Sequence, residues 1–210
     1  MTRVTLDQER AILNHFPPGT ALAGMDEVGR GSLAGPVGVG VAVVTALTPD
    51  PPGIIADSKA LSAARRHEAI GEIHAWAAVT SVGYASSQEI DEWGMTRALR
   101  IAGSRALVVV EKQMGAMGAI LLDGSHNWLG DDRVTLQVKA DQQCASVAAA
   151  SIVAKVDRDA LMVDAAREYP EYGWERNKGY GTAVHRQAIR EHGLSPHHRR
   201  SWRISGVNLQ

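Results

Sequence analysis

The chain has 210 residues, of which 45% are hydrophobic and 21% charged, and this length suits one domain with its own core. The composition excludes disordered, collagen-like and coiled-coil proteins. The single cysteine, Cys144, excludes a disulfide framework and a zinc site of several thiolates, and it favours a reducing, cytoplasmic location. The formal net charge is −1, but residues 171–210 hold seven Lys and Arg against three Asp and Glu. An acidic body therefore precedes a basic C-terminal end.

Strand and helix patterns alternate along most of the chain. Strands are expected at residues 21–28, 37–44, 80–85, 119–122 and 134–138. Helices are expected at residues 1–16, 63–77, 88–112, 142–168 and 182–192. Ser62 and Thr182 are predicted N-caps, and Gly94 and Gly103 interrupt the third helix. The order predicts an α/β fold with a mixed central sheet flanked by helices and a helical C-terminal extension.

Residues 31–49 form the one uncharged run that is long enough to span a membrane. Its glycines, its proline and its alternating valines favour a buried strand instead. The N-terminal segment carries charges within its apolar pattern, unlike a signal peptide. We therefore expect a protein without membrane contact.

Acidic residues stand where three of the predicted strands end. Asp26 and Glu27 close the first strand, Asp123 closes the fourth, and Asp141 follows the fifth and opens the long helix. If these strands are neighbours, the four carboxylates converge at one edge of the sheet. Mg²⁺ takes oxygen ligands, and two such ions about 4 Å apart catalyse phosphodiester cleavage. Taken singly, an Asp at a helix start or before glycine is usually a cap or a turn residue.

The acidic pair poses a geometric problem, because adjacent residues of a regular strand point to opposite faces. Asp26 and Glu27 serve one site only if the strand breaks there, and Gly29 and Gly31 favour such a break or bulge. The Gly29-Arg30-Gly31 turn also lets the backbone approach a ligand closely. It either binds a phosphate or sugar or only makes a tight turn.

Basic residues surround Tyr180 near the C-terminus, and a glycine precedes and follows this tyrosine in the sequence. Such a mixture fits a surface that follows phosphates and stacks on bases or sugars, and equally fits a solvated helix face with a buried Tyr. The basic residues in question are Arg176, Lys178, His185, Arg186, Arg190, His197, His198, Arg199 and Arg200. Lys59, in a predicted loop, is either a phosphate contact or a solvated side chain.

Several blocks of this sequence resemble the type 2 ribonucleases H, specifically the ribonuclease HII family. The opening block is Gly24-Met25-Asp26-Glu27-Val28-Gly29-Arg30-Gly31, with Leu33-Ala34-Gly35-Pro36-Val37 after it. The others, in family order, are Asp57-Ser58-Lys59-Ala60-Leu61-Ser62, Leu122-Asp123-Gly124, Lys139-Ala140-Asp141, residues 148–156 with Arg158-Asp159, Lys178-Gly179-Tyr180-Gly181-Thr182, and His198-Arg199-Arg200-Ser201. These ordered blocks cover nearly the whole chain.

The resemblance implies an RNase H-like catalytic domain over residues 1–170, with residues 171–210 as a basic helical segment packed on it. It implies a two-metal endonuclease, with Mg²⁺ or Mn²⁺ held by Asp26, Glu27, Asp123 and Asp141. The family cuts RNA in RNA–DNA hybrids and on the 5′ side of single ribonucleotides in DNA, leaving a 3′-hydroxyl and a 5′-phosphate. Such an enzyme starts the removal of ribonucleotides from DNA.

Substrate contacts follow from the same resemblance. The Gly29-Arg30-Gly31 backbone would read the ribose 2′-hydroxyl, the group that distinguishes RNA from DNA. Tyr180 would pack against the next sugar, and Lys59 and the basic end would hold flanking phosphates. We expect a monomer whose partners are RNA–DNA hybrids and DNA duplexes containing ribonucleotides. The end at Gln210 carries no peptide for a sliding clamp, so no clamp partner is expected.

Two departures from the family pattern are Gln142-Gln143, where relatives carry a nearby lysine, and Ser201-Trp202, where Ser-Phe is common. Asp57, Asp157 and His126 are treated as structural. Two alternatives stay open. One is a ribonuclease HIII-like hybrid nuclease, which usually carries an extra N-terminal domain for which Asp26 comes too early. The other is a non-catalytic nucleic-acid-binding module, for which the carboxylates would be a liability.

Overall fold

A computed structural model describes residues 4–55 and 61–204 of the chain. Its sheet has five strands in the order β3-β2-β1-β4-β5. The strands are β1 (Ala21–Val28), β2 (Val37–Thr45), β3 (Val79–Ala85), β4 (Ala119–Asp123) and β5 (Val134–Gln137). β1 pairs antiparallel with β2, and β2 antiparallel with β3, whereas β1–β4 and β4–β5 are parallel. The predicted mixed sheet is therefore confirmed, with each strand within one residue of its expected ends.

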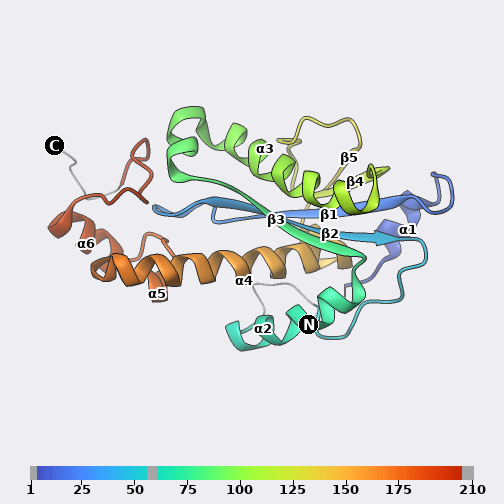
Figure 1. The fold of residues 1–210 in the computed structure, drawn as a ribbon, viewed down its shortest axis with the longest axis horizontal. Helices are drawn as coiled ribbons and strands as arrows, with labels where there is room; N and C mark the ends of the chain where they lie inside the picture. Colours follow the sequence, from blue (N-terminus) through green and yellow to red (C-terminus); the bar gives the residue numbers. More distant parts are fainter. Residues whose placement is uncertain (1–3, 56–60, 205–210) are drawn as a thin grey trace.

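Helices cover both faces of this sheet (Figure 1). The α-helices are α1 (Asp7–Leu13), α2 (Ala63–Trp76), α3 (Ser87–Met114), α4 (Ala145–Glu168), α5 (Trp174–Asn177) and α6 (Ala183–His192), with short 3-10 turns η1 (Ala140–Gln142) and η2 (Pro170–Tyr172). One hydrophobic core joins α3 to Val39, Val41 and the other odd-numbered apolar residues of β1 and β2, and to Ile120 and Leu122 of β4. A second joins α4 and α2 to Leu22, Ala42 and Val44. Because successive side chains of a strand point to opposite faces of the sheet, each strand contributes residues to both cores.

Helix α4 packs unusually close to the sheet because glycines face it. A Cβ added to Gly40 would lie 2.2 Å from the Ala150 carbonyl oxygen, and one added to Gly24 would lie 2.3 Å from Ser146 Oγ. The facing turns of α4 are mostly alanine and serine, all buried. Small residues on both sides therefore bring α4 against the end of β1 that carries Asp26.

The N-terminal helix α1 is attached to the start of α4 through a buried acid. Glu9 is fully buried, and its Oε1 accepts hydrogen bonds from Ser146 N (2.8 Å) and Ser146 Oγ (2.7 Å). Oε2 has no hydrogen-bond partner in the part of the chain that the structure describes. Burial raises the pKa of this carboxyl above its ordinary value, against the effect of the Ser146 hydrogen bonds. Glu9 thus caps the N-terminus of α4 from another segment of the chain, and burial of its carboxyl group costs desolvation energy.

Most helix signals in the sequence are confirmed, with two corrections. Ser62 and Thr182 accept hydrogen bonds as N-caps, and α3 is broken at Gly94 (φ +75°). The expected interruption at Gly103 is wrong, because this glycine stays helical to let the helix pack against Trp128. Asp141 does not open the long helix: it lies in η1, and α4 begins at Ala145.

The uncharged run 31–49 contains β2, as predicted, and no helix in the described ranges is both long and apolar enough to cross a membrane. A third core, at the end of the molecule where α5 and α6 lie (Figure 1), joins Tyr172, Trp174 and Ile189 to Met162 of α4 and Ala34. The basic C-terminal segment is thereby packed against α4 and the loop that follows β1.

Candidate active site

The acidic residues meet at the ends of three neighbouring strands. The β1–β4 register pairs Met25 with Leu122, so the next residues, Asp26 and Asp123, stand level at the same edge. β5 lies beside β4 and leads through residues 138–140 to Asp141 in η1. Asp123 Oδ1 accepts a hydrogen bond from Ala140 N (2.7 Å), which ties η1 to the end of β4. The convergence expected from the sequence is therefore present.

Asp26 and Asp141 are the buried acids of this group, with 6% and 2% of their surface exposed. Burial raises the pKa of Asp26 to about 7, a hydrogen bond with Ser151 of α4 opposes this rise, and the charges of Glu27, Asp123 and Asp141 add to it. Each of the other three carboxylates is therefore near enough to Asp26 for its negative charge to raise the pKa of Asp26. Clustered anions of this kind favour either a bound cation or a proton.

The expected strand break at Asp26 and Glu27 is wrong. β1 stays regular to Val28, with Asp26 opposite Gly40 and Glu27 opposite Val39 of β2. The chain leaves the strand only at Gly29, where φ is +76°. Both acids nevertheless line one cavity of about 290 Å³, because it lies at the tip of the strand, where both faces are within reach.

The donor set fits hard divalent cations, since four carboxylates supply oxygen only. Within residues 4–55 and 61–204, no group of three or more His, Cys, Asp or Glu is already arranged around a metal position. The carboxylates instead accept protein hydrogen bonds: Asp26 from Glu27 N, Asp123 from Ala140 N, and Glu27 from Arg30. A cation would replace these contacts and relieve the repulsion among the four carboxylates.

The two glycines of the turn after β1 are glycine for different reasons. At Gly29 a Cβ would lie 2.0 Å from Arg158 Nε, and φ is +76°, so the protein's own packing requires glycine. At Gly31 a Cβ would meet nothing within 4 Å, and φ is not left-handed. The missing side chain at Gly31 therefore leaves open space beside the cavity that Gly29, Arg30 and Gly31 line.

Tyr180 lines the same cavity and is half-buried. Lys155 Nζ lies 5.8 Å and the Arg158 guanidinium 5.6 Å from its ring centroid, so two cations flank the ring. Lys59 lies outside the described residues, as does Asp57. Of the other acids and histidines treated as structural, Asp157 accepts a hydrogen bond from Tyr84 Oη (2.6 Å), and His126 is exposed.

Three of the basic residues near the C-terminus are buried and do not form a phosphate-binding surface: His185, His198 and Arg199. His185 Nδ1 lies 3.0 Å from the Tyr180 carbonyl oxygen, and its Nε2 accepts a hydrogen bond from Trp174 Nε1 (3.0 Å). His198 Nδ1 accepts from Ser195 N, and its Nε2 lies 3.0 Å from His185 Nε2. With His185 donating from Nδ1 and His198 from Nε2, both rings are neutral, and Trp174 and His198 share the single lone pair of His185 Nε2. Burial, then the charge of His185, lowers the pKa of His198 to about 3.

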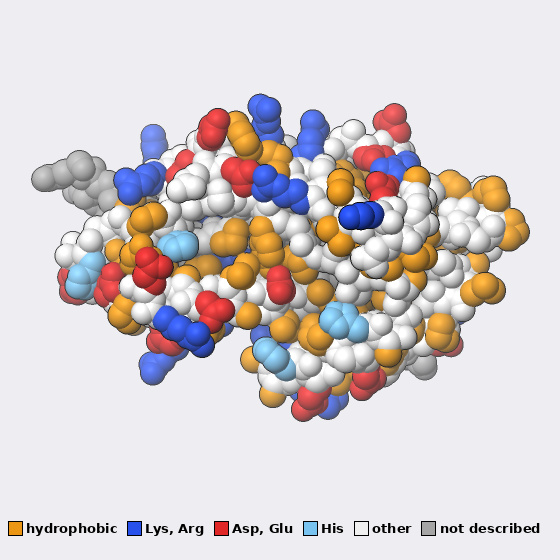
Figure 2. All heavy atoms as spheres, in the orientation of Figure 1, with side chains coloured by type: hydrophobic (Ala, Val, Ile, Leu, Met, Phe, Trp, Pro, Cys, Tyr) orange, Lys and Arg blue, Asp and Glu red, His pale blue; other side chains and the backbone are white. Residues whose placement is uncertain are grey.

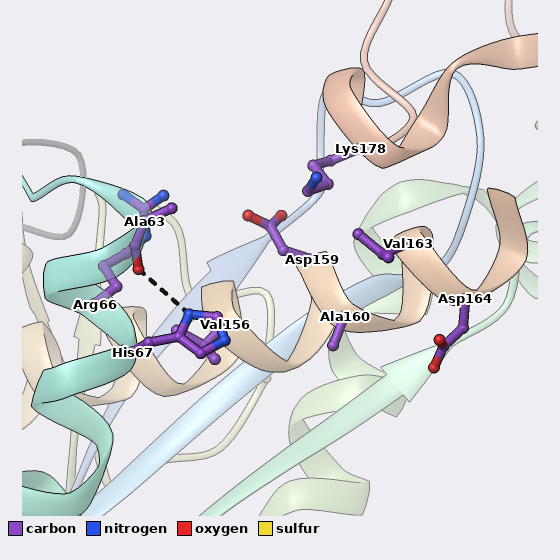
Figure 3. Close-up of a pocket in the computed structure, with 9 residues that line it drawn as sticks. All are labelled: Ala63, Arg66, His67, Val156, Asp159, Ala160, Val163, Asp164 and Lys178. Atoms are coloured by element: carbon purple, nitrogen blue, oxygen red, sulfur yellow. Dashed lines mark hydrogen bonds between the residues drawn. The ribbon is translucent and has the colours of Figure 1, made fainter.

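Sequence reasoning did not single out Arg66, Ser151 or Lys155, which also line the cavity beside Asp26 and Glu27. Ser151 and Lys155 stand one turn apart on α4, and this i, i+4 spacing in a buried helix is the signal that could have identified them. Arg66 also lines a second cavity of about 320 Å³ (Figure 3), where α2 faces Val156, Asp159 and Ala160 of α4 and Lys178 lies above. The two cavities are thus neighbours along α4.

Comparison with known proteins gives a consistent result. A family model described as Ribonuclease HII matches residues 23–205. The chain is 45% identical over 182 residues to Ribonuclease HII of Streptomyces coelicolor, covering 86% of this chain and 76% of that protein. It is 46% identical over 186 residues to Ribonuclease HII of Ruegeria pomeroyi, covering 87% and 76%.

Solved structures confirm the expected RNase H-like fold. The structure of a PCNA:RNase HII complex from Archaeoglobus fulgidus matches with a TM-score of 0.68 and 24% identity, over 86% of this chain and 93% of that one. The structure of Bst-RNase HIII in complex with Mn²⁺ matches with a TM-score of 0.66 and 25% identity, over 88% of this chain and 66% of that one.

Proposed function

Because the chain belongs to the ribonuclease HII family, whose members are hydrolytic endonucleases, we propose that it cleaves RNA in RNA–DNA hybrids and 5′ of single ribonucleotides embedded in duplex DNA. The products are a 3′-hydroxyl and a 5′-phosphate, and the reaction starts the removal of ribonucleotides from DNA. The observation that carries this proposal is the convergence of Asp26, Glu27, Asp123 and Asp141 at the ends of three adjacent strands.

In this proposal Asp26, Glu27, Asp123 and Asp141 hold Mg²⁺ or Mn²⁺. Bound divalent cations would supply an activated water and stabilise the departing 3′-oxygen. The chain's own groups then position the substrate. The backbone of the turn after β1 binds the ribose 2′-hydroxyl, since the open space at Gly31 admits a ligand there. Tyr180, held between two cations, packs against the following sugar.

Phosphate contacts in this proposal come from cations around the cavity and from exposed residues of the C-terminal segment. Lys155 and Arg66 line the cavity itself, and Arg176, Arg190 and Arg200 are exposed on the segment. Such contacts hold the duplex without reading its sequence. We further propose that the enzyme acts as a cytoplasmic monomer and that its bound partner is the nucleic acid.

The deciding experiment is metal-dependent nicking of a duplex with one ribonucleotide, with EDTA as the control. The expected result is a single cut on the 5′ side of the ribonucleotide with Mg²⁺ or Mn²⁺ and none with EDTA. Poor cutting of this duplex but good cutting of long hybrids would favour a ribonuclease HIII-like activity. Salt-sensitive binding without any nicking would favour a non-catalytic nucleic-acid-binding module.

A further inference from the structure

Two arginines lie fully buried beneath the turn that follows β1. Arg158 of α4 and Arg199 of the C-terminal segment both have 0% exposed surface, and neither forms an ion pair with the described residues. Their donors go almost entirely to backbone carbonyl oxygens of the loop after β1, with Ser32 Oγ shared between them. A buried guanidinium whose hydrogen-bond acceptors are all uncharged is rare, since its charge is compensated by dipoles alone. The arrangement therefore calls for a reason beyond packing.

The two arginines bind different parts of this loop. Arg158 donates to the carbonyls of Ala34, Pro36 and Lys178. Arg199 donates from Nη2 to the Gly29 carbonyl (2.6 Å) and from Nη1 to the Arg30 carbonyl (2.8 Å). Arg199 is thus the residue that binds consecutive peptide groups of the turn itself.

The contacts of Arg199 fix the direction of two amide groups. In a trans peptide the C=O and the following N–H point in opposite directions, and the described residues contain no cis peptide. With the Gly29 and Arg30 carbonyls turned inward to Arg199, the N–H groups of Arg30 and Gly31 point away from it. Neither amide donates a hydrogen bond within residues 4–55 and 61–204. These two donors are left for a ligand in the cavity that Arg30 and Gly31 line.

Several contacts keep the Arg199 guanidinium in this orientation. The Trp202 ring centroid lies 5.0 Å from its central carbon, and Nε donates to the Gly35 carbonyl (3.2 Å). The Arg199 backbone N–H also donates to the Leu33 carbonyl (2.9 Å). Burial lowers the pKa of Arg199 to about 9, so the side chain is still protonated near neutral pH. The planar guanidinium holds two donor nitrogens at a fixed separation, one for each carbonyl, whereas a lysine ammonium has a single nitrogen on a flexible chain.

We propose that Arg199 is the positioning residue for ribonucleotide recognition: by holding the Gly29 and Arg30 carbonyls, it aims the Arg30 and Gly31 amides at the ribose 2′-hydroxyl. The proposal rests on the function proposed above and adds to it the source of the discrimination. Arg199 touches no substrate atom and acts through the turn. The basic block at the C-terminus therefore contributes specificity from within the protein, in addition to phosphate contacts at its surface.

The test compares binding of two duplexes that differ in a single 2′-hydroxyl, one with a single ribonucleotide and one of DNA only. Binding is measured in EDTA, which stops metal-dependent cleavage. Wild-type protein is expected to prefer the ribonucleotide duplex by about tenfold, the effect of one or two new hydrogen bonds. Arg199→Lys is expected to bring this ratio near one while leaving the affinity for the DNA duplex within about twofold, because phosphate contacts are unaffected.

Arg133→Lys is the matched control. It removes a guanidinium that donates to the carboxylates of Glu111 and Asp131 where β5 begins, at the opposite end of that strand from η1, and that contacts neither the turn nor Tyr180. Its preference for the ribonucleotide is expected to stay near the wild-type ratio, even where both variants lose a similar amount of thermal stability. If Arg199→Lys does not fold, Trp202→Leu takes its place, because this half-buried ring orients the guanidinium without binding the turn. A clear fall in preference is expected there as well.

The outcomes separate the two proposals. A wild-type preference that persists in Arg199→Lys, or in Trp202→Leu where that variant replaces it, overturns the role of Arg199. A preference lost equally in Arg133→Lys also overturns it, because the loss then follows general destabilisation of the protein. Absence of any preference in the wild-type protein contradicts the proposed reading of the 2′-hydroxyl, and the role of Arg199 falls with it.

Discussion

Gly31→Ala separates folding from substrate binding at the turn after β1. A methyl group at this position meets no protein atom within 4 Å, and the backbone is not left-handed. The folded state therefore accepts alanine, and the less flexible unfolded chain makes the variant more stable by about 0.4–1 kcal/mol. Only a ligand that approaches the turn would contact the added methyl group.

The size of the effect on activity follows from contact distances. A hydrogen bond from a turn amide brings the ligand oxygen to about 2.9 Å from nitrogen, whereas two carbon atoms need about 3.5–4.0 Å. A methyl group beside the amide therefore displaces the bound sugar by about 1 Å, and a misplacement of this size reduces the rate about 100-fold. We expect kcat/KM on a duplex with one ribonucleotide to fall by about this factor.

The assay measures kcat/KM with Mg²⁺ on that duplex, together with urea unfolding of each variant. Gly71→Ala is the matched control, because a Cβ there also meets nothing within 4 Å but lies on the exposed side of α2. It should gain about 1 kcal/mol in stability and keep full activity. Gly29→Ala should instead fold poorly, since its Cβ would overlap Arg158. A Gly31→Ala enzyme with near wild-type kcat/KM would refute a ligand at this turn.

Three other substitutions test the remaining parts of the site and the fold. Asp26→Asn or Asp123→Asn should abolish cleavage in a nicking assay, while stability in EDTA is kept or raised because one clustered negative charge is removed; full activity would contradict the site. Tyr180→Ala should reduce cleavage at a single ribonucleotide about tenfold, and an unchanged rate would exclude its stacking role. Glu9→Gln keeps an acceptor for Ser146. Because the folded pKa of Glu9 is raised, the wild type should lose stability as pH rises above the ordinary glutamate pKa, and Glu9→Gln should lack that loss in urea titrations.

The convergence of the acidic residues at the strand ends could be predicted from the sequence because its signals are local. A strand that ends in an acid before a glycine is visible at Asp123, and Asp26 and Glu27 likewise stand at the end of a strand before Gly29. The regular continuation of β1 through Glu27 was not predictable in this way. It depends on pairing with β2 along the whole strand, which no local pattern reports. The 3-10 turn around Asp141 likewise depends on the contact of Asp123 with Ala140.

Burial of His185, His198 and Arg199 is the largest difference between the prediction from sequence and the structure. It too depends on contacts between residues far apart in the chain. A run of His and Arg is typical of an exposed surface, because buried charge needs partners. Here the partners are carbonyl groups of a glycine-rich loop far away in the chain, such as those of Gly29 and Gly35. Only the tertiary fold brings these carbonyls to Arg199. No periodicity or motif spacing encodes that contact directly.

The charge asymmetry of the chain therefore serves more than one purpose. Figure 2 shows Lys and Arg side chains dispersed among acidic ones on one face, rather than gathered in a single field. Residues 171–210 hold seven Lys and Arg, but Arg199 is buried and cannot displace counterions from DNA. Since each phosphate contact contributes about −0.9 to the slope of log K against log salt, the segment supports a slope no steeper than about −5. A clearly steeper slope for the wild-type protein would require cations from the acidic body, with Lys155 and Arg66 at the cavity as the first candidates.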